Sequence, residues 1–154
     1  MSVNVASYQK IKSELDSHKV LLVAVSKTKP NEDIQALYNL GHRDFGENYV
    51  QELVDKQAQL PKDIHWHFIG HLQSNKVKYI APFVHLIHGV DSIKLLQEIN
   101  KQAAKQNRVI NCLLQVHIAT EETKFGFDEA SLNDFIQNKS WESLPNICIK
   151  GLMG

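Results

Sequence analysis

Short apolar runs alternate along the chain with segments in which apolar residues recur at helical spacing. The clearest run, LLVAVS at residues 21–26, is too short for an ordinary helix and is rich in apolar and β-branched residues. This pattern predicts a strand that is buried on both faces of a sheet. Lys27 follows the run directly, so the lysine is expected at the carboxyl end of the predicted strand.

A helix is predicted immediately after Lys27. Pro30 blocks the strand from continuing, and Asn31 can cap a helix. Glu32 and Asp33 then lie where the helix dipole favours negative charge. Ligands bind at such strand-to-helix turns in parallel α/β folds, and a lysine beside apolar walls there can lose its charge and act as a nucleophilic amine. A solvated lysine that closes a strand has the same local pattern.

The remaining chain repeats this strand-and-helix unit. Residues 5–18 predict a short amphipathic helix before the first strand, and Gly41 is placed to end the helix that follows Lys27. Apolar residues at helical spacing predict further helices around Leu53, Val77, Leu96 and Phe135. The helix around Leu96 can be capped by Ser92 or Asp91, and the helix around Phe135 is expected to start near Asp128. Further strands are predicted at residues 42–48, 64–69, 84–92, 111–119 and 146–154.

Six strands separated by helices, at roughly 20 to 30 residues per unit, predict an α/β fold with a parallel sheet. The natural closure is a (β/α) barrel of the TIM type, but such barrels need about 200 or more residues. A barrel of this pitch is therefore expected to lack its last two strands in these 154 residues. An open doubly wound sheet fits the length better, yet no GxGxxG or P-loop pattern brings a nucleotide to it.

Composition narrows the possible partners. The chain is 43% hydrophobic, which is enough for one core and one domain, and its 17 basic residues balance 17 acidic ones. The basic residues are scattered, so neither nucleic acid nor an anionic membrane is an expected partner. A small molecule that carries a phosphate is still allowed, because backbone N–H groups at helix starts can hold it.

Cysteine use and the amino-terminal residues predict a cytoplasmic protein. Cys112 and Cys148 both fall in apolar, strand-like runs, which is typical of buried thiols in a reducing compartment. The opening residues MSVNVASYQK lack the apolar centre of a signal peptide. No stretch approaches the roughly 20 apolar residues of a membrane span.

The histidines raise the question of a metal. His65 and His67 share one face of a predicted strand and His71 follows the next turn, which is the pattern of some metal-dependent hydrolases. Trp66 and Phe68 flank these positions, however, and no carboxylate lies at a convincing ligand spacing in the same segment. No metal site is therefore predicted. The other histidines, at positions 18, 42, 85, 88 and 117, have no mutual spacing that indicates a site.

Five motifs together resemble one family. VSKTKP, FGENYVQE, WHFIGHLQSNK, TKFGF and GLMG occur in the order found in the pyridoxal 5′-phosphate homeostasis proteins, the YggS/PROSC family. The resemblance runs from about residue 20 to the last residue. It implies the fold of the amino-terminal barrel of alanine racemase and pyridoxal 5′-phosphate as the cofactor.

The same resemblance implies roles for individual residues. Lys27, the lysine of VSKTKP, is expected to form the Schiff base with pyridoxal phosphate, and Lys124 matches a family lysine in a loop near the cofactor. No catalytic residue is assigned. The other positions expected to bind the cofactor are Asn48, His71, Ser74, Asn75 and Met153.

Three functions remain open at this point. The resemblance implies a protein that carries pyridoxal phosphate, buffers its concentration and delivers it to apo-enzymes, without turnover of a substrate. The alternatives are an amino-acid racemase that uses the same imine and, on the histidines alone, a metal-dependent hydrolase. Family members continue past GLMG through two more strands, so residues 1–154 are expected to be one truncated cofactor-binding barrel domain that can self-associate through its open sheet edges.

Overall fold

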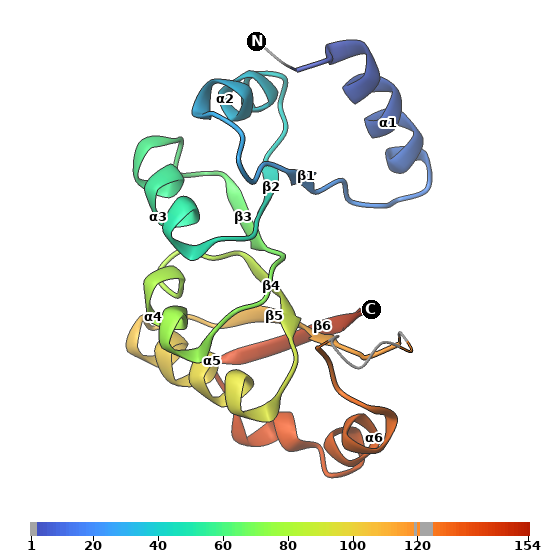
Figure 1. The fold of residues 1–154 in the computed structure, drawn as a ribbon, viewed down its shortest axis with the longest axis vertical. Coiled ribbons are helices and arrows are strands. Elements are labelled where there is room, and N and C mark those ends of the chain that lie inside the picture. The colour runs from blue at the N-terminus through green and yellow to red at the C-terminus, as the bar shows by residue number, and fades with distance from the viewer. Residues whose placement is uncertain (1–2, 119, 121–124) are drawn as a thin grey trace.

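The strands form one curved parallel sheet in which each strand pairs with the next in sequence (Figure 1). The computed structural model describes residues 3–118, 120 and 125–154. The strands are β1 (Ala24–Val25), β2 (Asp44–Glu47), β3 (His65–Phe68), β4 (Leu86–Val90), β5 (Ile110–Gln115) and β6 (Ile147–Met153). This sequential order is that of a barrel, and it rules out the doubly wound alternative, in which the order reverses.

Helices follow the strands in chain order and lie in an arc along one side of the sheet (Figure 1). The helix α1 precedes β1 and stands apart from this arc. The helices are α1 (Val5–Ser17), α2 (Asn31–Asn39), α3 (Val50–Gln59), α4 (Val77–Ile80), α5 (Ile93–Lys105) and α6 (Glu129–Gln137), with short 3-10 turns η1 (Ser74–Lys76) and η2 (Ser140–Ser143). None of the helices in the described ranges is long and apolar enough to span a bilayer.

The core lies between the sheet and the arc of helices. Phe45, Trp66 and Phe68 point from β2 and β3 toward the helices and are almost fully buried, as are Leu53 of α3 and Leu96 of α5. Burying each such side chain stabilises the fold by roughly 1.5–3 kcal/mol. Side chains at the alternate strand positions point to the other face, so the two faces of the sheet have different chemistry.

The first strand is less buried than its sequence predicts. The expected strand at residues 21–26 is reduced to Ala24–Val25, and Leu21 and Val25 are 59% and 55% exposed. The prediction of burial on both faces is wrong because β1 pairs only with β2, at the edge of the sheet. An apolar run alone cannot distinguish a central strand from an edge strand.

The predicted helix ends are mostly confirmed. Gly41, with φ of +97°, ends the helix after Lys27, and the side chains of Ser92 and Asp128 accept hydrogen bonds from the first turns of α5 and α6. The expected cap at Asn31 is wrong. Pro30 holds the capping position, and the Asn31 side chain instead donates a hydrogen bond to Gln59.

The open edges predict self-association. In the described residues β6 pairs on one side only, and Leu152 on this strand is 59% exposed. Because an unprotected edge strand is a template for another strand, we expect the chain to sediment as a dimer or larger species. Leu152→Lys places a charge on the edge and should shift the distribution toward the monomer.

Val109→Lys is the matched control, since Val109 is equally exposed but lies outside the strands. It should leave the sedimentation pattern unchanged. A wild-type chain that sediments as a monomer at every concentration would contradict the prediction.

Candidate functional site

The residues that the sequence assigns to a ligand gather at the carboxyl edge of the sheet. Lys27 follows β1, Asn48 follows β2, and His71 follows β3. Ser74 and Asn75 lie in η1, the first turn after that loop, and Met153 is the last residue of β6. Parallel α/β folds bind ligands at the carboxyl ends of their strands. The predicted residues therefore lie at the end of the sheet where a ligand is expected.

Ser26 fixes the backbone immediately before Lys27. It is buried, its N–H donates to the Gly46 carbonyl oxygen at 2.9 Å, and its hydroxyl donates to Glu47 Oε2 at 2.9 Å. Lys27 itself is exposed. The described residues therefore do not enclose its amine in the apolar walls that could lower its charge, and they leave that amine open to an approaching molecule.

A buried lysine on α3 holds the other side of this turn. Lys56 is 5% exposed, and its ammonium donates to the Ser26 carbonyl oxygen at 2.7 Å. It also donates to Glu47 Oε1 at 2.5 Å and to Glu52 Oε1 at 2.6 Å. All three protons of one ammonium thus bind acceptors on β2, on α3 and on the residue that precedes Lys27.

The residue after Lys27 is strained. Thr28 has a φ of +62°, in the left-handed region that β-branched residues rarely adopt. Its N–H donates to Glu52 Oε1 at 2.6 Å, the same oxygen that accepts from Lys56. The surrounding contacts therefore determine the backbone on both sides of Lys27, which is common where strain is retained at a site of function.

The two carboxyl groups of this cluster differ in their environment. Burial raises the pKa of the Glu47 carboxyl, and the Lys56 ammonium and the Ser26 hydroxyl oppose that rise. Burial also acts to raise the pKa of Glu52, but hydrogen bonds from Lys56 and from the Thr28 N–H outweigh it and lower that pKa. Glu52 is therefore the better-stabilised anion of the two.

Two glycines allow the next strand ends to approach each other closely. A Cβ atom at Gly70 would lie 2.8 Å from the carbonyl oxygen of Asn48, and one at Gly89 would lie 2.9 Å from that of Gly70. Real Cβ atoms do not come so close. The ends of β2, β3 and β4 therefore meet backbone to backbone, and this contact positions Asn48.

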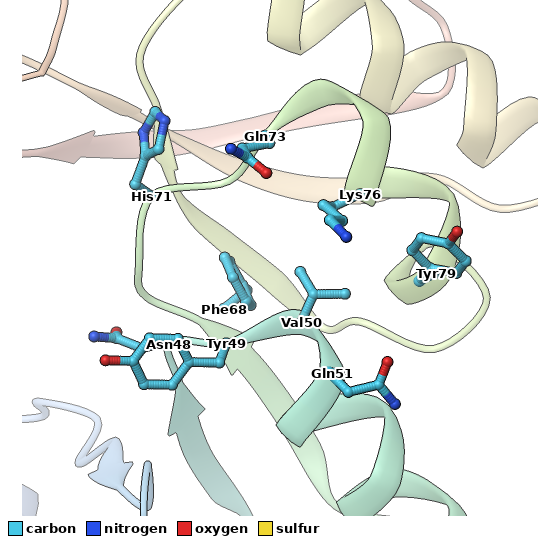
Figure 2. A pocket seen from close by; sticks show the side chains of 9 residues that line it. All are labelled: Asn48, Tyr49, Val50, Gln51, Phe68, His71, Gln73, Lys76 and Tyr79. Atoms are coloured by element: carbon cyan, nitrogen blue, oxygen red, sulfur yellow. The ribbon is translucent and has the colours of Figure 1, made fainter.

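His71 and Asn48 line a cleft of about 450 Å³. Figure 2 shows Lys76 on one side of this cleft, with Val50 facing it from the start of α3. The imidazole of His71 stacks on Phe125 with ring centroids 4.0 Å apart, and its Nδ1 lies 3.3 Å from Asp91 Oδ2.

The other predicted residues do not line this cleft. Met153 is half-buried at the end of β6, where its carbonyl oxygen accepts a hydrogen bond from the Val116 N–H at 2.7 Å. Ser74 and Asn75 lie in η1 beside the cleft, and Lys27 lies on its own turn. Lys124 lies outside the described residues. Of the predicted residues that the structure describes, only Asn48 and His71 therefore line the same cavity.

The structure also contains residues that sequence reasoning missed. Lys56 lies three residues after the buried Leu53 and four before the buried Leu60, on the apolar stripe of α3. A lysine at such a position is a signal for a buried ion pair. The sequence pattern assigns Asp91 only to a helix cap, although it follows the end of β4 much as Lys27 follows that of β1.

The histidines group differently from the set of His65, His67 and His71 that the sequence pattern suggests. His71 pairs with Asp91, while His67 lies with Asp44 and His85. The carboxylate missing from the local segment is thus supplied by β2. His65, His67 and His71 do not form the donor group found among the described residues.

The sequence matches the family model of the alanine racemase amino-terminal domain over residues 5–154. The chain belongs to this family. Among its relatives are the pyridoxal phosphate homeostasis proteins of Pasteurella multocida, 41% identical over 139 residues, and of Aquifex aeolicus, 44% identical over 133 residues. These matches cover 87% and 86% of this chain and 58% of each relative, so the chain spans about three fifths of their length.

Solved structures of the family agree with the fold. PipY of Synechococcus elongatus with pyridoxal phosphate bound is 37% identical, with a TM-score of 0.81, and the match covers 94% of this chain and 68% of PipY. Alanine racemase from Bartonella henselae is 19% identical, with a TM-score of 0.63 over 81% of this chain and 35% of the racemase. The second likeness supports the barrel fold alone. The resemblance to the homeostasis proteins is confirmed.

The buried ion cluster should make a large contribution to stability. Lys56→Met keeps the length of the side chain but leaves the Glu47 carboxylate buried without its cation. Because an unpaired buried charge is costly, we expect a loss of about 3–5 kcal/mol in the free energy of unfolding. Urea denaturation followed by far-ultraviolet circular dichroism measures this loss.

Lys101→Met is the matched control, because Lys101 lies on the exposed face of α5. It should change the free energy of unfolding by no more than about 0.5 kcal/mol. Equal stabilities of the two variants would show that the cluster contributes little.

Proposed function

We propose that this chain binds pyridoxal 5′-phosphate in the homeostasis of that cofactor, with Lys27 as the residue that forms the Schiff base. The observation that carries the proposal is an exposed lysine, fixed at the carboxyl end of β1, in a chain 37% identical to PipY, whose structure contains pyridoxal phosphate. The curated relatives named above are pyridoxal phosphate homeostasis proteins.

The residues at the carboxyl edge fit such a ligand chemically. A primary amine is the group that condenses with the cofactor's aldehyde, and the amine of Lys27 is accessible to it. The bound cofactor supplies an electrophilic carbon and a conjugated ring. The Asn48 amide, the His71 imidazole and the side chains of Ser74 and Asn75 are hydrogen-bonding groups suited to its polar substituents, and Met153 offers an apolar contact.

The backbone around Lys27 suits a carrier. Ser26 and Thr28, the two neighbours of the lysine, are both tied to the cluster of Lys56, Glu47 and Glu52. The lysine stem therefore starts from a fixed point, and only its own rotamers need to be ordered when the ligand binds. Such preorganisation lowers the cost of binding.

We propose a carrier rather than an enzyme. The relatives at about 40% identity are named homeostasis proteins, whereas the likeness to alanine racemase is limited to the fold. In this proposal residues 1–154 act as one cofactor-binding domain in the cytoplasm and pass the cofactor to apo-enzymes. The apolar runs that contain Cys112 and Cys148, both free thiols, are consistent with a reducing compartment.

Lys27→Ala should abolish the imine absorption band of the cofactor-loaded protein. The fold should survive, because the exposed side chain makes little core contact. Lys29→Ala is the matched control, since Lys29 is an exposed lysine on the same turn, and it should keep the band. Absorption spectra before and after borohydride reduction measure the effect. Reduced adducts that map by mass spectrometry mainly to Lys76 or Lys124 would contradict the assignment.

The cofactor-loaded chain should not racemise amino acids. Incubation with single enantiomers of alanine and of other amino acids should leave the optical rotation constant, because the proposed role is storage and transfer. Alanine racemase under the same conditions serves as the positive control. A sustained loss of optical rotation that requires Lys27 would contradict the carrier proposal and support the racemase.

A further inference from the structure

A second group of polar residues lies near the amino ends of the strands, away from the carboxyl ends that carry Lys27, Asn48 and His71. Asp44 and His65 are the first residues of β2 and β3, and His85 directly precedes β4. His67 and His88 are the third residues of β3 and β4. The group therefore occupies the face of the sheet opposite to Phe45, Trp66 and Phe68, near the amino ends of the strands.

Strand pairing brings these side chains together. Asp44 is the register partner of His65, and the His85 N–H donates to the Trp66 carbonyl oxygen at 2.8 Å. The Asp44 carboxylate consequently lies 2.9 Å from His67 Nε2 and 3.3 Å from His65 Nδ1. The ring of His85 stacks on that of His65, with centroids 4.4 Å apart.

Three of these residues form a set of donor atoms. One carboxylate oxygen of Asp44 and one ring nitrogen each of His67 and His85 all lie within 4.8 Å of one another. Ligand atoms about 2.0–2.1 Å from a zinc ion are separated by a little over 3 Å in tetrahedral geometry, so small side-chain rotations would bring the set into range.

From this geometry we infer that Asp44, His67 and His85 bind a divalent transition-metal ion, such as zinc. Two imidazoles and one carboxylate are a common ligand set for these ions, and the fourth position would be held by water. The site is distinct from the carboxyl-edge site around Lys27, and the inference does not depend on the proposed function.

The next layer of contacts also suits a metal. His67 Nδ1 lies 2.9 Å from His88 Nε2, so the ring nitrogen of His67 that faces away from Asp44 already has a hydrogen-bonding partner. Metal-ligating histidines are held by such outer partners, which fix the tautomer and the ring orientation.

Burial differs among the three proposed ligands. Asp44 and His67 are buried, whereas His85 is partly exposed, which gives an ion a route to the site.

The ion would link β2, β3 and the start of β4, where few residues pair between strands. β2 pairs with β3 at four positions, and β3 pairs with β4 at only two. A metal bound by β2, β3 and the residue before β4 would stabilise the amino ends of these strands. The role of the ion is therefore structural, and the folded chain should gain thermal stability when it binds.

Titration of the full chain with Co²⁺ and Zn²⁺ tests this inference. We expect saturable binding of one ion per chain, visible absorption of the Co²⁺ form typical of low coordination number, and a rise in Tm with Zn²⁺. His85→Gln and Asp44→Asn should each weaken Zn²⁺ binding by at least about 100-fold, and His88→Gln, which removes only an outer partner, by about 10–100-fold.

His18→Gln is the matched control, because His18 is an exposed histidine at the end of α1. It should leave the affinity unchanged. Asp44 is buried, so circular dichroism must first show that its variant is folded; if it is not, the partly exposed His85 decides the result. Absence of saturable binding, or binding that His85→Gln leaves unchanged, would overturn the inference.

Discussion

The turn that carries Lys27 depends on a buried ammonium group, that of Lys56. β1 contributes only two residues to the sheet, so strand pairing alone gives the turn after it little support. Lys56 supplies that support from α3, through hydrogen bonds to Ser26, Glu47 and Glu52. A buried cation of this kind is tolerated only because all its protons are bound, and the same bonds fix the backbone that carries Lys27.

The two faces of the sheet carry different side chains, and so do the carboxyl and amino ends of its strands. The face toward the helices provides the apolar core and, at the end of β2, the buried pair of Glu47 with Lys56 of α3, whereas the other face carries Asp44 and the histidines of β3 and β4. Lys27, Asn48 and His71 lie at the carboxyl edge, and the histidine group lies toward the amino edge. The period of two along each strand separates the core from the polar face, and the direction of the parallel strands separates the two polar sites.

Apolar spacing and turn residues predicted the strands and the helices that alternate with them in the right order, although β1 is shorter than expected and the turn η2 was not predicted. The family motifs then single out Lys27 as the proposed Schiff-base residue, a role that its position alone left open. Sequence could not predict that Val25 is exposed, since edge and central strands share the same pattern. It also could not group Asp44 with His67 and His85, because that group depends on the register of three strands. Lys56 was missed because Glu52 and Lys56, four residues apart, resemble an ordinary surface pair.

The contacts at Gly70 and Gly89 have a mechanical consequence. Side chains between neighbouring segments normally act as compliant spacers, since they can change rotamer when one segment shifts. Here the backbone of Asn48 touches that of Gly70, which in turn touches that of Gly89, with no such spacer between them. With no side chain between them to give way, the ends of β2, β3 and β4 cannot move closer to one another.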